Sequence, residues 1–165
     1  MFCFAHFDKY QMPERHIGST ASALMLNIGQ DCGYRNLDDH VHVWELAGNK
    51  AQAKAWMPAR SESGMHWLFK GFILNPDELI AELGINPARK YRDAELYGKA
   101  FDAWGDAADD RVHGEYAALA WDPSERTTRL VRSPISAPPL HYTRRGHDYV
   151  VATAPRGIFG TGLID

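Results

Sequence analysis

Two cysteines and two closely spaced histidines are the residues of this sequence whose types are best suited to chemistry. Cys3 and Cys32 are its two thiols, and a thiolate is both a nucleophile and a metal ligand. His40 and His42 lie two residues apart, so on a strand both would share one face, as metal ligands can. A metal site needs three or four ligands, and the sequence offers no evident third. We therefore predict no metal site and interpret the pair as half-exposed strand histidines.

Other short motifs carry little information. Gly160-Thr161-Gly162 is a lone GxG pattern, which occurs by chance too often to indicate a phosphate site, and we interpret it as a loop. The sequence has no phosphate loop, no dinucleotide fingerprint after a strand and no cysteine pair at zinc spacing. Two cysteines do not make a disulfide framework. Arg144-Arg145 is interpreted as the solvated tip of a hairpin.

Three segments have the apolar spacing of helices. The first spans 18–29, with Ser19 or Thr20 as its cap, Gly29 as its terminator, and an apolar stripe that ends at Ile28. A second begins with Asn75 as cap and Pro76 in the first position and ends at Gly84.

The third predicted helix runs from Arg92 to Trp104 and ends at Gly105, with Asp93 and Glu95 suited to its positive N-terminus. Aromatic and β-branched segments that alternate between these helices predict strands. The predicted strands span 2–7, 41–46, 65–73, 115–121, 127–132, 140–143 and 149–153. Asp122-Pro123 presets a turn between two of them. Strands joined by hairpins form antiparallel sheets, so the pattern predicts an α+β fold in which helices cover sheets.

Five stretches of the second half occur in a characteristic order: FKGFILNPDEL, RDAELYGKAFDAWGD, HGEYAALAWDP, RTTRLVRSPISAPPLHY and YVVATAPRGIF. This series resembles the N-terminal glutaminase domain of asparagine synthetases, which are class II glutamine amidotransferases within the N-terminal-nucleophile (Ntn) hydrolases. The matching positions are Gly71 and Asn75, Asp93 and Glu95, Gly114 to Asp122, and Pro139 to Tyr142. The Ala-Pro-Pro-Leu and Ala-Pro-Arg segments also resemble the asparagine-synthetase-like cyclases of lasso-peptide biosynthesis, a specialised branch.

The resemblance implies an architecture and a partner. It implies an Ntn-hydrolase-like four-layer α/β/β/α sandwich with antiparallel sheets, with residues 1–159 as the glutaminase-like domain and 160–165 as the start of a linker. In the family, a synthetase domain that uses ATP and Mg²⁺ to adenylate a carboxylate follows this domain. The Ser-Gly-Gly-x-Asp-Ser loop of that second domain is not in this sequence. We expect no cofactor in this chain, and a synthetase domain in cis or on a separate chain.

The resemblance also implies chemistry that Cys3 does not fit. The family uses an N-terminal Cys thiolate to attack the amide of glutamine, and its own α-amino group, with a pKa near 8, serves as the base. Here Phe2 precedes Cys3, and Phe2 is too bulky for the usual removal of an initiator Met. On a strand, Cys3 also lies one pleat away from where the first residue points. We predict a buried, inert thiol and keep Cys3 only as a vestigial candidate nucleophile.

The glutamine pocket that the resemblance implies is altered too. The family's oxyanion-hole Asn falls at Lys70 and its glutamine-binding Glu falls at Phe72, where we expect a buried aromatic ring. Gly71 can still offer a backbone N–H. Asp93 matches the second ammonium-binding carboxylate, although support of a helix N-terminus explains it equally well. Asn75 is likewise explained by capping.

We therefore interpret the chain as a degenerate amidotransferase domain of an ATP-dependent amide ligase, without glutamine hydrolysis. Its expected role is to support the synthetase domain and to present a surface to a peptide substrate. Two alternatives remain. An active amidotransferase that supplies ammonia for asparagine synthesis would need processing that exposes Cys3, and a free-standing binding module would use the same pocket for another ligand.

Composition sets the outer bounds. The chain has 165 residues, of which 45% are hydrophobic and 24% charged, and this favours one globular domain. Its 18 Lys and Arg against 21 Asp and Glu give a formal charge of -3, so no electrostatic surplus indicates nucleic acid or an anionic membrane. With no run of 18 apolar residues and no signal segment, a cytoplasmic location is expected.

Overall fold

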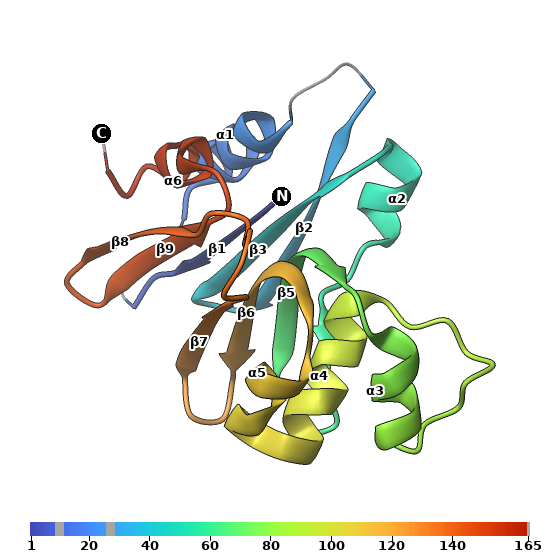
Figure 1. The fold of residues 1–165 in the computed structure, drawn as a ribbon. Coiled ribbons are helices and arrows are strands. Elements are labelled where there is room, and N and C mark those ends of the chain that lie inside the picture. Colours follow the sequence, from blue (N-terminus) through green and yellow to red (C-terminus); the bar gives the residue numbers. More distant parts are fainter. Residues whose placement is uncertain (9–11, 26–28, 165) are drawn as a thin grey trace. The chain divides into compact units, whose positions relative to one another are not determined.

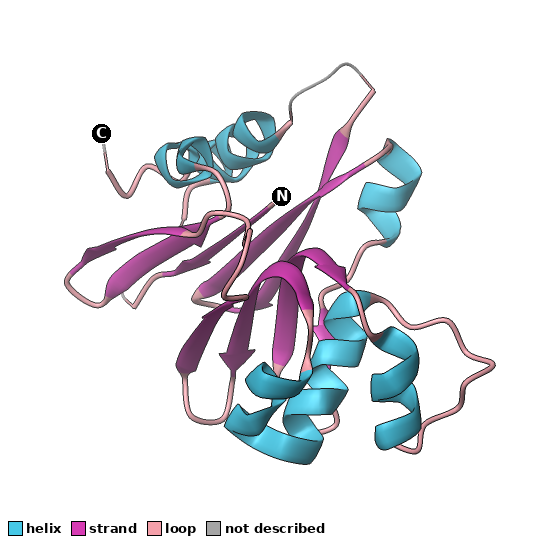
Figure 2. Cartoon of the chain, in the orientation of Figure 1, coloured by secondary structure: helices cyan, strands magenta, loops and turns pink. Residues whose placement is uncertain are grey.

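A computed structural model describes residues 1–8, 12–25 and 29–164. The chain forms two compact units, Met1–Met57 with Pro139–Asp165, and Pro58–Pro138. Each unit combines one antiparallel sheet with helices and has its own hydrophobic core (Figures 1 and 2). Among the helices of the described residues, none has the length and apolar character that crossing a bilayer requires.

The first unit is built on a five-stranded sheet in the order β2-β3-β1-β9-β8. Its strands are β1 (Phe2–His6), β2 (Asp31–Asp38), β3 (Val41–Ala47), β8 (His141–Arg145) and β9 (Asp148–Ala152). Its helices are α1 (Glu14–Leu24), α2 (Lys50–Ala55) and α6 (Pro155–Gly160). The first strand of the chain is therefore the central strand of the sheet, and both of its neighbours are antiparallel to it.

Helices α1 and α6 pack beside each other, and their side chains share a core with one face of the first unit's sheet (Figure 1). A Cβ added at Gly160 would lie 2.6 Å from Thr20 Cα, so the two helices touch at a position where only a glycine fits. The Thr161 hydroxyl donates to the Ile158 carbonyl at 2.6 Å, and Leu163 is buried in the core. The packed part of this unit therefore extends past Phe159, and Gly160-Thr161-Gly162 serves helix packing.

The second unit contains a four-stranded sheet in the order β4-β5-β6-β7. Its strands are β4 (Ala59–Arg60), β5 (His66–Ile73), β6 (Gly114–Asp122) and β7 (Thr127–Arg132). Its helical segments are α3 (Pro76–Glu82), α4 (Asp93–Trp104), the 3-10 turn η1 (Gly105–Ala107) and α5 (Ala108–Arg111). Helix α4 packs on β5, and α3 packs on α4.

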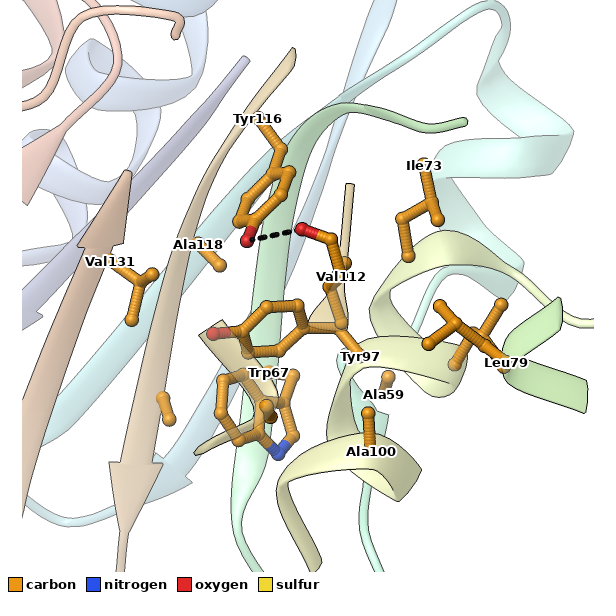
Figure 3. Close-up of a cluster of buried hydrophobic side chains, with 13 residues drawn as sticks. Ala59, Trp67, Ile73, Leu79, Tyr97, Ala100, Val112, Tyr116, Ala118 and Val131 are labelled. Atoms are coloured by element: carbon orange, nitrogen blue, oxygen red, sulfur yellow. Dashed lines mark hydrogen bonds between the residues drawn. The ribbon is translucent and has the colours of Figure 1, made fainter. Parts of the chain in front are cut away.

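Aromatic rings dominate the core of the second unit (Figure 3). Trp67 lies 5.1 Å from Tyr97 between ring centroids, and Tyr97 meets Tyr116 edge-on at 5.4 Å. The Tyr97 hydroxyl donates to the Asp109 carboxylate, which also accepts a hydrogen bond from the Arg129 guanidinium. Burial and this hydrogen bond to Asp109 raise the pKa of Tyr97, so its hydroxyl stays protonated and keeps donating.

The structure confirms the expected α+β class, all seven predicted strands and two of the three predicted helices. Helix α4 begins at Asp93, where the Glu95 carboxylate accepts from the Arg92 N–H at 3.3 Å, and it ends at Trp104, directly before Gly105 with φ +57°. Helix α3 begins at Pro76 and is followed by Gly84 with φ +62°. These boundaries could be predicted because Pro, Gly and the acidic first turn act locally.

The first predicted helix is misplaced. In the structure this helix is α1, which begins at Glu14 and ends at Leu24 rather than spanning 18–29. Ile28 lies outside the described residues. Ser19 and Thr20 are not caps. They lie inside the helix, and their hydroxyls donate to the carbonyls of residues four positions earlier, a bond that is available only within a helix.

Candidate functional site

Cys3 occupies the middle of a doubly paired strand. It lies opposite Trp44 of β3 and Ala152 of β9. The residue before it is equally fixed, because the Phe2 N–H donates to Thr153 Oγ1 at 3.0 Å and the Phe2 carbonyl accepts from the Thr153 N–H at 3.1 Å. The backbone nitrogen of Cys3 is therefore that of an internal peptide bond within a sheet.

The Cys3 side chain points into the core between the sheet and α6. It is 0% exposed, and its Sγ donates to the Gly157 carbonyl at 3.7 Å. Burial raises the pKa of Cys3 far above its usual range, and the nearby Cys32 thiol adds to this rise. A thiol that stays protonated and has no solvent access is a poor nucleophile. Cys32, the other free cysteine, has its pKa raised to about 12 by burial and by the Asp31 carboxylate.

Lys70, Gly71 and Phe72 form the end of β5 in the second unit. All three are exposed in succession, which departs from the alternation of a regular strand. Gly71 causes this departure, since its φ of +119° lies in the region that favours glycine. The prediction of a buried ring at Phe72 is wrong, because Phe72 is 46% exposed and lies opposite Glu115.

Asn75 is at the N-cap position of α3, but its side chain makes no capping hydrogen bond, so the predicted cap is wrong. Instead, Nδ2 donates to the Arg111 carbonyl at 2.9 Å, and Oδ1 accepts from the His113 N–H at 2.9 Å. The amide therefore joins the end of β5 to the segment that leads into β6. A primary amide can do this because it carries a donor and an acceptor side by side.

Asp93 is the first residue of α4. Partial burial raises the pKa of its carboxyl group, and a hydrogen bond from the Ile73 backbone opposes this rise. The contact with Ile73 places Asp93 beside the last residue of β5. The candidate pocket residues Lys70, Gly71, Phe72, Asn75 and Asp93 thus all belong to the second unit, whereas Cys3 belongs to the first.

The two histidines have separate structural roles. His40 is in a turn rather than on a strand, and its Nδ1 donates to the Phe7 carbonyl at 2.8 Å. His42 is buried rather than half-exposed, and its Nδ1 is hydrogen-bonded to the Tyr34 hydroxyl at 2.9 Å. Across the residues that the structure describes, no group of three or more His, Cys, Asp or Glu side chains could hold a metal ion.

The burial of His42 makes the stability of the first unit depend on pH. Burial lowers the pKa of His42, and the neighbouring His40 lowers it further, while Asp38 opposes both. Below a pH of about 6.5, His42 is protonated in the unfolded chain but stays neutral in the folded unit. The free energy of unfolding therefore falls as the pH drops through that value. We expect denaturation midpoints to fall less on acidification in His42→Gln than in the unaltered chain. In His147→Gln, which alters an exposed histidine, the fall should stay unchanged.

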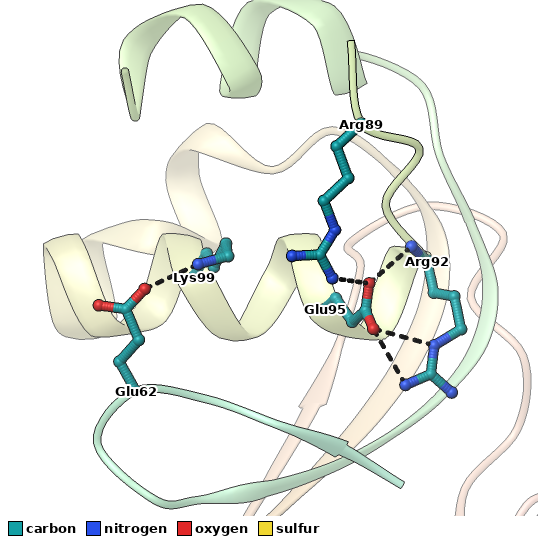
Figure 4. A network of polar contacts seen from close by, with 5 residues as sticks. All are labelled: Glu62, Arg89, Arg92, Glu95 and Lys99. Carbon is teal, nitrogen blue, oxygen red and sulfur yellow. Dashed lines mark hydrogen bonds and ion pairs between the residues drawn. The ribbon is translucent and has the colours of Figure 1, made fainter. Parts of the chain in front are cut away.

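A cluster of charged side chains that no sequence motif indicated lies at the start of α4 (Figure 4). Glu95 contacts both Arg89 and Arg92, and Lys99 pairs with Glu62 at 2.8 Å. These residues come from three separate segments, so no spacing in the sequence predicts the cluster. Its one sequence signal is the basic run that begins at Arg89.

Comparisons with known proteins give one family match and a structural match. Residues 48–159 match the sequence profile of the family described as "Glutamine amidotransferase domain". A solved structure of glutamine phosphoribosylpyrophosphate amidotransferase from B. subtilis, complexed with ADP and GMP, matches with a TM-score of 0.68 and 16% identity. That match covers 98% of this chain and 44% of the other, so this chain spans less than half of that protein. A search of curated proteins gives no match.

Proposed function

Because this chain belongs to the family of glutamine amidotransferase domains and has their Ntn-hydrolase type of fold, we propose that it is a degenerate member that does not hydrolyse glutamine. The observation that carries the proposal is the position of Cys3. In an N-terminal nucleophile, the free α-amino group takes the proton from the thiol. The corresponding nitrogen here is acylated by Phe2, and an amide nitrogen is not a base.

The surroundings of Cys3 support the same proposal. Cleavage before Cys3 would have to act on a peptide bond whose preceding residue is hydrogen-bonded to Thr153 and paired with Glu45. The thiol points into a closed core against Gly157. Processing therefore requires opening of the central strand of the sheet.

The substitutions in the second unit support the loss of the substrate site. At the position where the family has an oxyanion-hole Asn, Lys70 offers a flexible ammonium group, and loss of one preorganised donor costs about 3 kcal/mol of transition-state stabilisation. At the position of the glutamine-binding Glu, Phe72 has no charge for the substrate's ammonium group. The amide of Asn75 is occupied by the backbone of Arg111 and His113.

A glutaminase assay tests the proposal. We expect glutamate release from glutamine by the unaltered chain to equal that by Cys3→Ala and by a blank without protein. The double variant Lys70→Asn with Phe72→Glu restores the family's residues at exposed positions, and we expect it to remain inactive while Phe2 precedes Cys3. Release above the blank that disappears in Cys3→Ala would contradict the proposal.

We further propose that the domain serves an asparagine-synthetase-like, ATP-dependent amide ligase, of which the lasso-peptide cyclases are the branch that its Ala-Pro-Pro-Leu segment favours. The motif series supports this parentage, and the solved amidotransferase, which is more than twice as long, shows that such domains occur within longer chains. ATP and Mg²⁺ would then bind to the synthetase domain. The amidotransferase-type domain described here would support the synthetase domain and present a surface to a peptide substrate.

The ligase proposal has its own test. With the synthetase domain present, in cis or as a separate chain, we expect ATP-dependent amide formation to be the same with and without glutamine. Cys3→Ala should leave that rate unchanged. A rate that depends on glutamine and falls in Cys3→Ala would show that the domain supplies ammonia.

A further inference from the structure

A hollow of about 140 Å³ lies beside the first half of α4, within the second unit. Its lining is almost entirely charged or polar and consists of Arg60, Ser61, Glu62, Arg89, Glu95 and Lys99. The space far exceeds the roughly 10–15 Å³ that one water molecule needs. None of these residues takes part in the amidotransferase chemistry discussed above.

The charges around this hollow do not balance. Glu95 is shared between two guanidinium groups, at 3.5 Å from Arg89 and 3.2 Å from Arg92 (Figure 4). Glu62 pairs with Lys99 at 2.8 Å. In the described part of the chain Arg60 has no ion-pair partner, and the hollow is lined by three cationic groups against two carboxylates. This local excess of positive charge occurs in a chain whose net charge is -3.

We propose that the hollow binds a phosphate group through the guanidinium groups of Arg60 and Arg89 and the ammonium group of Lys99. With Glu62 displaced, three cationic groups face the one carboxylate of Glu95, and a phosphate dianion matches that excess of two positive charges. Guanidinium groups bind phosphate oxygens in a planar, bidentate fork, and a Lys ammonium adds a point charge.

The bound phosphate would displace the Glu62 carboxylate from its ion pair with Lys99. Its side chain is 81% exposed, whereas that of Lys99 is 24% exposed. An exposed carboxylate loses little when it returns to water, since exposed ion pairs are weak. Phosphate would therefore replace Glu62 as the partner of Lys99, while Glu95 stays fixed by its two arginines and by the N–H of Arg92.

A second hollow of about 240 Å³ shares Glu62 and Lys99 with the first. Its other lining residues are the apolar Leu83, Ile85 and Ala103 together with Asp102, whose carboxylate accepts hydrogen bonds from the N–H groups of Glu62 and Ser63. Displacement of Glu62 would join the two spaces, so the phosphate group of a monoester could bind at the arginines with an apolar body beside Leu83. Free phosphate and a phosphate monoester share the same recognition chemistry.

The test is a titration of the full chain with inorganic phosphate at constant ionic strength, at an alkaline pH where both inorganic phosphate and phosphate monoesters are dianions. Backbone amide shifts in the NMR spectrum report the binding. We expect saturable shifts at Ser61, Glu62 and Lys99, and about tenfold weaker binding in Arg60→Gln and in Arg89→Gln. Arg145→Gln, which alters an exposed arginine of the first unit, is the matched control and should bind as the unaltered chain does.

Glu62→Gln gives the sharpest arm, because it removes the competing carboxylate and should tighten phosphate binding severalfold. Phenyl phosphate separates the two sources of the ligand. Tighter binding than inorganic phosphate indicates a monoester, and equal binding indicates free phosphate. No saturable shift, or weakening by Arg145→Gln equal to that by Arg60→Gln, would overturn the proposal. The outcome does not depend on glutamine hydrolysis.

Discussion

Gly71→Ala should remove about 4 kcal/mol or more of the stability of the second unit. The Cβ of an alanine at this position would lie 2.0 Å from the Glu115 carbonyl oxygen, and the φ of +119° is one that side chains other than glycine rarely adopt. Backbone strain of this kind costs about 1–3 kcal/mol, and the clash with the neighbouring strand adds to it. Chemical denaturation followed by tryptophan fluorescence measures the loss.

Gly64→Ala is the matched control for that experiment. Gly64 also has a positive φ, of +94°, but its added Cβ would meet only Arg60 Nη2 at 3.9 Å. We expect it to lose about 1–2 kcal/mol, from strain alone. Equal losses in the two variants would show that the approach to Glu115 does not constrain Gly71. The close approach of the neighbouring strand is enough to require a glycine at position 71. The presence of Gly71 is therefore no evidence of catalysis.

Trp67→Ala should cost about 3–5 kcal/mol, because it opens a cavity at the centre of the second unit's core. The side chain is 1% exposed and contacts the rings of Tyr97 and Phe101. An added Cβ on Gly98 would lie 3.0 Å from Trp67 Cδ1, so the indole fills the space beside that glycine. A fall in the denaturation midpoint, without a change in the number of transitions, is the expected readout.

Trp67→Phe separates packing from hydrogen bonding. Within the described residues, Trp67 Nε1 is buried without a hydrogen-bond partner. Phenylalanine therefore loses volume but no polar contact, and we expect less than half the cost of Trp67→Ala. A cost as large as that of alanine would mean that the indole N–H makes a bond that matters.

Seven of the strands, and helices α3 and α4, could be predicted because their signals are local. Pro76 with Gly84, and Arg92 with Gly105, mark helix ends through backbone preferences that no tertiary contact overrides. Strands β2 and β4 and helices α2, α5 and α6 were not predicted, since β2 is a largely polar edge strand and the other four are short. Their positions depend on distant contacts, such as that between Gly160 and Thr20.

The candidate site divides in the same way. Burial of Cys3 could be predicted from its place in an apolar strand. Its contact with Gly157 could not, because it depends on helix α6, which no sequence pattern predicted. Exposure of Phe72 could not be predicted, because the positive φ of Gly71 breaks the alternation on which the prediction relied. The role of Asn75 depends on residues more than thirty positions away.

The most direct test of the account is the reactivity of Cys3 in the native chain. We expect a diazo-ketone analogue of glutamine to leave Cys3 unlabelled at neutral pH, as intact mass and peptide mapping would show, because the thiol is buried and its pKa is raised. In denaturant, iodoacetamide should label both Cys3 and Cys32. Stoichiometric labelling of Cys3 by the glutamine analogue in the native chain would contradict the account, since only an accessible, activated nucleophile reacts in that way.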